Sequence, residues 1–273
     1  GRLGNKDILV VFSRNAVWQY DPYTGIRKEL VRTSSLYGSK IFGLIPRMDL
    51  FRDLNGDGLD DLIIPNFGGF RVFIQNAAGE FSGPLDIDAP PMVDMSYNNF
   101  PWYQPKSSFL SDMTLDGKND LIFWIDDAFS IFSQNNQGRF MTVPQRFKPS
   151  VQFQYDGLEG MNIAMQDEDQ SDISGKALSQ ISDFDGDGIS DLVTLSIRSE
   201  GVFKKQTTYD FHKGIAGDGQ VEFSPFPDSR IKSKGIQFEM EEKDFNNDGQ
   251  TDMVISAVEL GIGKVLGALI TGS

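Results

Sequence analysis

The sequence predicts an all-β fold made of many short strands. Glycine occurs 28 times among the 273 residues, and polar turn residues separate apolar runs that are short and rich in β-branched or aromatic side chains. These features are typical of strands bounded by turns. The 22 phenylalanines supply material for a sizeable core. Because no stretch approaches 18 uninterrupted apolar residues, we expect no membrane insertion.

A repeated acidic loop organises the chain. Four segments share the pattern D-x-[DNT]-x-D-G-x-x-D, and we name them loop 1 (Asp53–Asp61), loop 2 (Asp112–Asp120), loop 3 (Asp183–Asp191) and loop 4 (Asp244–Asp252). Gly4–Asp7 matches the closing G-x-x-D of a fifth. The closing aspartates are 54, 59, 71 and 61 residues apart. This range is somewhat above the length of one four-stranded propeller blade, so each repeat is predicted to be a blade with variable insertions.

The segments around each loop repeat as well. An apolar strand is predicted after each closing Asp, at Ile8–Phe12, Leu62–Ile64, Leu121–Ile125, Leu192–Leu195 and Met253–Ile255. A second strand follows, at Ala16–Tyr20, Phe70–Gln75, Phe129–Ser133, Tyr209–Lys213 and Lys264–Ile270. Turns at Gly79 and Gly138 lead to a third, and a further strand precedes each loop. We therefore predict a β-propeller of four-stranded antiparallel blades, a single domain or a fragment of one, with blades at 1–35 (partial), 41–90, 106–150, 176–232 and 236–273.

The loop spacing is that of a site for a hard cation. Side chains at positions 1, 3 and 5 of such a tight loop point inward, position 7 offers a backbone carbonyl, and position 9 closes the shell with a carboxylate. Glycine at position 6 permits the sharp turn. Ligands that are all oxygen favour Ca²⁺, with Mg²⁺ or Mn²⁺ as alternatives. The predicted ligands are Asp53, Asn55, Asp57, Leu59 and Asp61 in loop 1, Asp183, Asp185, Asp187, Ile189 and Asp191 in loop 3, and Asp244, Asn246, Asp248, Gln250 and Asp252 in loop 4.

Loop 2 departs from this ligand set. Thr114 stands where the other loops have a carboxylate or an amide. We expect the loop, with its candidate ligands Asp112, Thr114, Asp116, Lys118 and Asp120, to bind calcium less tightly or to stay empty.

Other interpretations of the loops are weaker. An EF-hand needs a glutamate at position 12, which falls here at Ile64, Phe123, Thr194 and Ile255. A single Asp-Gly loop could be a plain hairpin turn. Four loops in register favour a metal, because such a density of carboxylates would repel without a counter-ion.

The motif also resembles that of a known family. The pattern D-x-[DN]-G-D-G-x-x-D-[LM]-[IV], present at Asp53–Ile63 and Asp183–Val193, resembles the FG-GAP/VCBS repeat of integrin α-subunit N-terminal domains and of many bacterial secreted proteins. The resemblance implies a β-propeller, usually of seven blades, with Ca²⁺ in the loops that join strands 1 and 2. The chain would supply about four and a half to five blades, so we expect a fragment of a longer protein, with a closed five-bladed ring as the alternative.

Composition excludes several kinds of partner and site. The formal charge of −14 argues against nucleic acid and anionic membranes, both of which require basic patches. Without cysteine there are no disulfides and no thiolate metal sites. The only histidine, His212, could serve a Ser-His-Asp triad but no multi-histidine zinc site, and we expect it to be structural.

Two insertions break the repeat, and in a propeller they would emerge on the face opposite the metal loops. The insertion 90–105 carries Tyr97, Phe100, Trp102 and Tyr103, which form either an aromatic platform for a sugar or a partner protein, or a lid packed over blade edges. The second, Asp156–Gly175, contains an acidic run at 167–172 that we expect to be a solvated loop.

Together these features predict a calcium-stabilised, non-catalytic binding or adhesion module that presents inter-blade loops to a protein or glycan. The alternatives are the propeller scaffold of a polysaccharide-active enzyme and a structural domain of a toxin or surface assembly. An extracellular, cell-surface or periplasmic location is expected, because calcium loops of extracellular modules bind at about 10⁻⁴–10⁻³ M.

Overall fold

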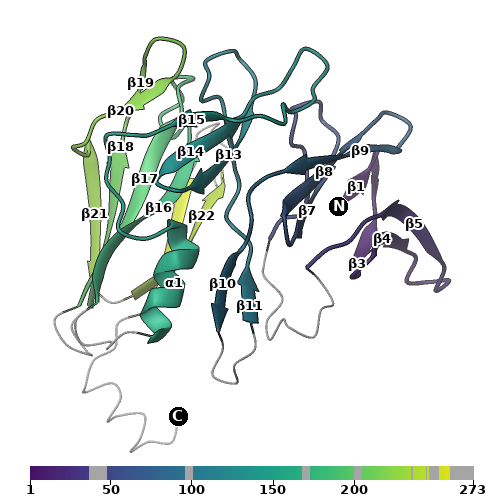
Figure 1. Cartoon of the computed structure of the whole chain (residues 1–273), viewed down its shortest axis with the longest axis horizontal. Coiled ribbons are helices and arrows are strands. Elements are labelled where there is room, and N and C mark those ends of the chain that lie inside the picture. The colour runs from purple at the N-terminus through teal and green to yellow at the C-terminus, as the bar shows by residue number, and fades with distance from the viewer. Residues whose placement is uncertain are drawn as a thin grey trace, which may run out of the picture. The chain divides into compact units, whose positions relative to one another are not determined.

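Strands dominate the fold, as the sequence predicted. The computed structural model describes residues 1–36, 48–95, 101–167, 173–199, 205–234, 236–243, 245 and 252–258, and this part of the chain contains one helix (Figure 1). The chain divides into two compact units. The first comprises residues 1–112, 116–125 and 129–147, and the second comprises 113–115, 126–128 and 148–273.

The first unit is built from small sheets whose described pairings are antiparallel. Its strands are β1 (Arg2–Leu3), β2 (Lys6–Asp7), β3 (Leu9–Phe12), β4 (Ala16–Tyr20), β5 (Arg27–Arg32), β6 (Phe51–Arg52), β7 (Asp61–Asn66), β8 (Gly69–Gln75), β9 (Phe81–Ile87), β10 (Met92–Met95), β11 (Pro101–Gln104), β12 (Phe109–Ser111), β13 (Asp120–Ile125), β14 (Ala128–Phe132) and β15 (Gln145–Phe147). The sheets are β1–β2, β3–β5, β6–β9, β10–β11 and β12–β15.

Strand β7 of the sheet β6–β9 is buried on both faces. Side chains alternate between the faces of a strand, and Ile63 of β7 packs in one cluster with Phe123 of β13. Its neighbours Leu62 and Ile64 pack in another, with Val17 of β4. This double burial explains why β7 is apolar along most of its length.

The second unit contains the longest strands. Its elements are α1 (Gly157–Asp167), β16 (Ser174–Ser182), β17 (Asp191–Ser199), β18 (Lys205–His212), β19 (Gly214–Ala216), β20 (Val221–Phe223), β21 (Ser229–Lys234), β22 (Ile236–Lys243) and β23 (Asp252–Val258). One sheet has the order β16-β17-β18-β21, so the β19–β20 hairpin is inserted before the fourth strand. β22 and β23 form a two-stranded sheet.

The helix α1 was not predicted, and it occupies the first part of the insertion Asp156–Gly175. Leu158 and Met161, three residues apart, lie on one face of α1. Both pack in the cluster that contains Ala177 and Val193. Figure 1 shows α1 beside β16, which it contacts. The acidic run begins at the last residue of α1, and 168–172 lie outside the described residues.

The outer strand of the β12–β15 sheet also differs from the prediction. The turn at Gly138 was expected to lead directly into a strand, but Phe140 makes only an isolated bridge to Gln134. The strand that pairs with β14 is β15, with Phe129 opposite Phe147. The predicted strand at 264–270 lies outside the described residues, which form no closed barrel or propeller.

Candidate metal centres

Each described acidic loop joins the first two strands of a four-stranded sheet. Loop 1 connects β6 to β7, loop 2 connects β12 to β13, and loop 3 connects β16 to β17. The closing Asp is in every case the first residue of the second strand. Of loop 4, which lies between β22 and β23, the structure describes Phe245 and Asp252, so the candidate ligands Asp244, Asn246, Asp248 and Gln250 lie outside the described residues.

The aspartate at position 1 organises the backbone of its loop. In loop 1, one carboxylate oxygen of Asp53 accepts hydrogen bonds from the amides of Gly56 (2.7 Å) and Asp57 (3.2 Å), and the other accepts from Gly58 (2.8 Å). This arrangement bends the chain around the carboxylate. The turn is therefore formed by the loop's own residues.

Loop 3 repeats the arrangement around Asp183. Its carboxylate accepts from the amides of Gly186 (2.9 Å), Asp187 (3.2 Å) and Gly188 (2.9 Å). In loop 2, Asp112 accepts from the amides of Asp116 (3.1 Å) and Gly117 (2.7 Å). The three loops thus share one backbone conformation at their start.

Two positions of this conformation have left-handed backbone dihedrals. At position 6 the φ angles are 84° for Gly58, 81° for Gly117 and 85° for Gly188. At position 4 they are 79° for Gly56, 57° for Leu115 and 75° for Gly186. The sequence pattern explained glycine at position 6 but missed the same requirement at position 4. Leu115 meets it at the steric cost of a side chain in the left-handed region.

Positions 3, 5 and 7 are linked in register. In loop 3 the Asp187 amide donates to Asp185 (3.2 Å), and the Ile189 amide donates to Asp187 (2.9 Å). In loop 1 the corresponding bonds run from Asp57 to Asn55 (3.0 Å) and from Leu59 to Asp57 (2.9 Å). The backbone amide at position 7 thereby holds the carboxylate at position 5 in place.

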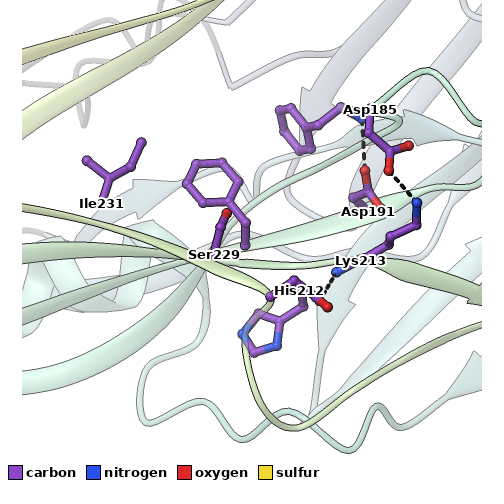
Figure 2. Close-up of a pocket in the computed structure, with 9 residues that line it drawn as sticks. Asp185, Asp191, His212, Lys213, Ser229 and Ile231 are labelled. Atoms are coloured by element: carbon purple, nitrogen blue, oxygen red, sulfur yellow. Dashed lines mark hydrogen bonds and ion pairs between the residues drawn. The ribbon is translucent and has the colours of Figure 1, made fainter.

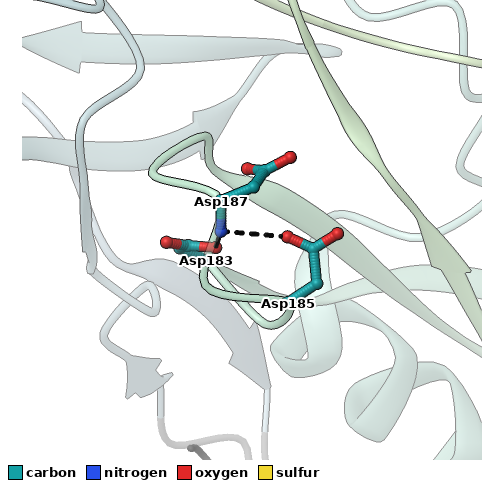
Figure 3. A group of neighbouring side chains, drawn as sticks. All are labelled: Asp183, Asp185 and Asp187. Atoms are coloured by element: carbon teal, nitrogen blue, oxygen red, sulfur yellow. Dashed lines mark hydrogen bonds between the residues drawn. The ribbon is translucent and has the colours of Figure 1, made fainter.

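Loop 3 brings three carboxylates together. Asp183, Asp185 and Asp187 each offer an oxygen, and the three oxygens lie within 4.8 Å of one another (Figure 3). Calcium binds oxygen at 2.3–2.6 Å, so oxygens around one ion are separated by at most about 5 Å. The spacing and the oxygen chemistry of this cluster fit a single Ca²⁺.

The closing aspartate is buried instead of joining that cluster. The Asp61 side chain is fully buried, and its two oxygens accept from the amides of Leu54 (3.0 Å) and Gln75 (2.8 Å). Asp191 accepts likewise from Phe184 (3.0 Å) and Gly214 (2.8 Å).

Burial raises the pKa of Asp61 to about 7, against the opposing effect of its two backbone hydrogen bonds. Burial also raises the pKa of Asp191. Each carboxylate oxygen has a second lone pair, so these hydrogen bonds leave capacity for a cation.

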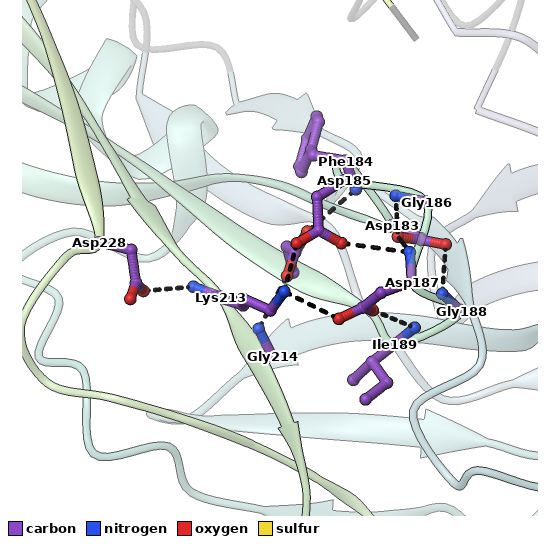
Figure 4. A network of polar contacts seen from close by, with 11 residues as sticks. Asp183, Phe184, Asp185, Gly186, Asp187, Gly188, Ile189, Lys213, Gly214 and Asp228 are labelled. Atoms are coloured by element: carbon purple, nitrogen blue, oxygen red, sulfur yellow. Dashed lines mark hydrogen bonds and ion pairs between the residues drawn. The ribbon is translucent and has the colours of Figure 1, made fainter. Parts of the chain in front are cut away.

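A lysine contacts the acidic cluster of loop 3. The Nζ of Lys213 lies 2.5 Å from an Asp185 oxygen and 3.0 Å from an Asp187 oxygen (Figure 4). These hydrogen bonds raise the pKa of the Lys213 ammonium and lower that of the Asp187 carboxyl. The sequence pattern does not reveal this contact, because Lys213 is 22 residues beyond the loop and the pairing of β17 with β18 brings it close.

Loop 2 differs from loops 1 and 3 in its ligands and its neighbours. Besides Thr114 at position 3, it carries Lys118 at position 7, whose Nζ lies 3.6 Å from an Asp116 oxygen and 3.2 Å from Asn136. Asp120 is fully buried, as Asp61 is in loop 1. A cationic side chain beside the position-5 carboxylate adds a second reason to expect weak calcium binding here.

The aromatic residues of the insertion 90–105 are only partly described. Tyr97 and Phe100 lie outside the described residues, and Trp102 is in β11, where it pairs with Asp94 of β10. Tyr103 packs edge-on against Phe67, with ring centroids 4.9 Å apart.

This part of the chain exposes apolar side chains. Phe67 is 50% exposed, and Val93 and Met95 are each 59% exposed. Tyr103 lies opposite Val93 in the strand pairing, and Met95 is two residues from Val93. The side chains of Val93, Met95 and Tyr103 therefore share one face of the hairpin β10–β11. We refer to Phe67, Val93, Met95 and Tyr103 as the hairpin patch.

His212 is fully buried, and its Nδ1 lies 2.8 Å from the carbonyl oxygen of Ser224. Burial lowers its pKa. His212 is the last residue of β18, where its side chain alternates with that of Phe211. A pocket of about 300 Å³ beside the end of β18 is lined by Phe184, Asp185, Asp191, Phe211, His212, Lys213, Asp228, Ser229 and Ile231 (Figure 2).

No protein-family description matches the chain, and no curated protein matches its sequence. No helix among the described residues is long and apolar enough to cross a membrane.

Proposed function

We propose that this chain is a calcium-binding, non-catalytic β-propeller module whose folded state is stabilised by the cation. The observation that supports this most is the acidic cluster of loop 3, where three carboxylates converge from positions 1, 3 and 5. Loop 1 has the same hydrogen-bonded frame with Asn55 at position 3. Oxygen ligands from an irregular loop of this kind suit Ca²⁺ better than Mg²⁺, which demands near-ideal octahedral geometry.

The propeller is supported by the repetition and by packing within the first unit. The sheets β3–β5, β6–β9 and β12–β15 each have the strand order of a blade or part of one. The β6–β9 sheet shares its core with the other two. The ring centroids of Phe70 in β8 and Phe123 in β13, for example, are 5.0 Å apart. Radial stacking of sheets is how propeller blades bury both faces.

The proposed binding surface is the hairpin patch. Large apolar side chains on a scaffold's connecting hairpin are candidates for contact with a partner. We propose a protein or glycan partner outside the cytoplasm, where calcium reaches the concentrations such loops require. Replacement of Val93 and Met95 by serine is expected to abolish retention on cell surfaces or glycan arrays that bind the unmodified chain. Unchanged retention of a folded variant would exclude the hairpin patch as the binding surface.

Thermal unfolding with calcium or a chelator tests the proposed calcium dependence. A free calcium concentration 100 times the Kd stabilises the fold by about 2.7 kcal/mol per site, which corresponds to a rise of several degrees in Tm. Asp187→Asn should reduce the rise, because it removes one charged ligand yet keeps an acceptor for the Ile189 amide. Asp218→Asn makes the same charge change at an exposed position outside the loops and should have no effect. Identical melting curves with calcium and with chelator would refute the proposal.

A further inference from the structure

We propose that the Lys213 ammonium is an internal counter-ion of loop 3, which calcium must displace in order to bind there. Lys213 would thereby set loop 3 to a weaker affinity than its four predicted acidic ligands would otherwise give. This inference rests on the proposed calcium binding and adds a residue outside the loop that controls it.

The contacts of Lys213 are with the metal ligands themselves. Its Nζ lies 2.5 Å from an Asp185 oxygen and 3.0 Å from an Asp187 oxygen, and both aspartates belong to the cluster that fits one cation. An ammonium at that distance would stand within a few ångströms of a bound Ca²⁺. Two cations so close repel each other, so occupancy by one disfavours the other.

The backbone at Lys213 is fixed while its side chain is accessible. The Lys213 amide donates to Asp228 (2.7 Å), and the next amide, of Gly214, donates to Asp191 (2.8 Å). The side chain is 49% exposed and borders the pocket of about 300 Å³ (Figures 2 and 4). The ammonium can therefore move into water without any change in the fold, as displacement requires.

Loop 1 shows the same structural position without a lysine. The amide of Gln75 donates to Asp61 as that of Gly214 donates to Asp191, so the counterpart of Lys213 is Ile74. None of the ion pairs among the described residues involves Asp53 or Asp57.

The ligand charges differ accordingly. Loop 1 has an amide at position 3, whereas loop 3 has the carboxylate of Asp185, which is the closest partner of Lys213. The additional negative charge in loop 3 is thus matched by the additional positive charge. With the lysine in place the two loops carry the same net charge on these groups, and without it loop 3 is one charge more negative.

The test follows each loop separately by NMR during a calcium titration of the ¹⁵N-labelled chain, starting from metal-free protein. The amide of Gly188 reports on loop 3 and that of Gly58 reports on loop 1, because both donate to the position-1 carboxylate of their loops. Lys213→Met keeps the length of the side chain and removes its charge. Lys232→Met removes the same charge from an exposed position of β21 and is the matched control.

We expect Lys213→Met to lower the calcium concentration at the Gly188 midpoint by about tenfold and to leave the Gly58 midpoint within about twofold. Lys232→Met should leave both midpoints within about twofold. A Gly188 response that appears only in Lys213→Met would also support the inference. If Gly58 responds to calcium and the Gly188 midpoint is the same with and without the lysine, the inference is wrong while calcium binding stands. If neither amide responds in any variant, both proposals are wrong.

Discussion

The carboxylate of Asp61 accepts a 2.8 Å hydrogen bond from the backbone amide of Gln75, which ties the end of loop 1 to the last residue of β8. The second oxygen of Asp61 accepts from Leu54, inside the loop. The same relationship joins Asp191 to Gly214 beside loop 3. The closing aspartate therefore connects the metal loop to the following hairpin, whether or not a cation is bound.

Removal of this connection should destabilise the chain even without calcium. Asp61→Ala leaves the buried amides of Leu54 and Gln75 without their acceptor, and we expect a loss of about 2–4 kcal/mol in the free energy of unfolding. Urea unfolding in the presence of a chelator measures it. Asp88→Ala, at an exposed position, should change the stability by less than about 0.5 kcal/mol. Equal stabilities for the two variants would show that Asp61 has no structural role.

The pKa of Asp61 predicts an unusual pH dependence in metal-free protein. Burial raises this pKa from 3.8 to about 7, so between these values the unfolded chain ionises at Asp61 while the folded chain keeps the proton. Ionisation of the unfolded chain lowers the stability of the fold as pH rises through this window, by up to about 1.4 kcal/mol per pH unit from this group. Below pH 4 and above pH 7, Asp61 has the same charge in the folded and unfolded chain, so the stability does not change with pH through this group.

A ¹³C NMR titration of the Asp61 carboxyl group in chelated protein measures this pKa directly. Asp61→Asn identifies the resonance by its disappearance. We expect a midpoint near pH 7 without metal and a lower midpoint in saturating calcium, because a nearby cation favours the ionised form. A midpoint near 4 in the chelated protein would contradict the role given to burial.

The left-handed φ angle of glycine at position 6 leads to a third prediction, which concerns stability and calcium binding. Gly188→Ala places a Cβ at φ 85°, although no atom lies within 4 Å of that Cβ, so the cost comes from the backbone alone. We expect a loss of about 1–2 kcal/mol in stability together with weaker calcium binding by loop 3. In Gly68→Ala the φ angle lies outside the left-handed region and the nearest atom is 3.5 Å away, so the stability should change little. Similar losses in both variants would mean that φ at position 6 does not control the loop.

The strands next to the loops were predictable from the sequence for a physical reason. A β-strand buried on both faces must be apolar at successive positions, and the strands β7 and β13 show this directly after Asp61 and Asp120. The position of each strand within the repeat then predicted which strands belong to the same sheet. The bounds differ by a few residues, because a strand ends where pairing ends and not where apolar residues end.

Features that depend on tertiary contacts were missed. The apolar spacing of Leu158 and Met161 in α1 is short and lies among polar residues, so no helix was predicted in this insertion. The contact of Lys213 with Asp185 depends on the register between β17 and β18, which the sequence does not reveal. Asp61 and Asp191 were recognised as candidate ligands, but their hydrogen bonds to Gln75 and Gly214 come from strand pairing.

The most direct test of the account is anomalous diffraction from crystals grown in calcium, with data collected at a long wavelength where calcium scatters anomalously. The account predicts one anomalous peak in loop 3, 2.3–2.6 Å from oxygens of Asp183, Asp185 and Asp187, and a second in loop 1 beside Asp53 and Asp57. Ordered water at both positions, with no anomalous signal at saturating calcium, would contradict it.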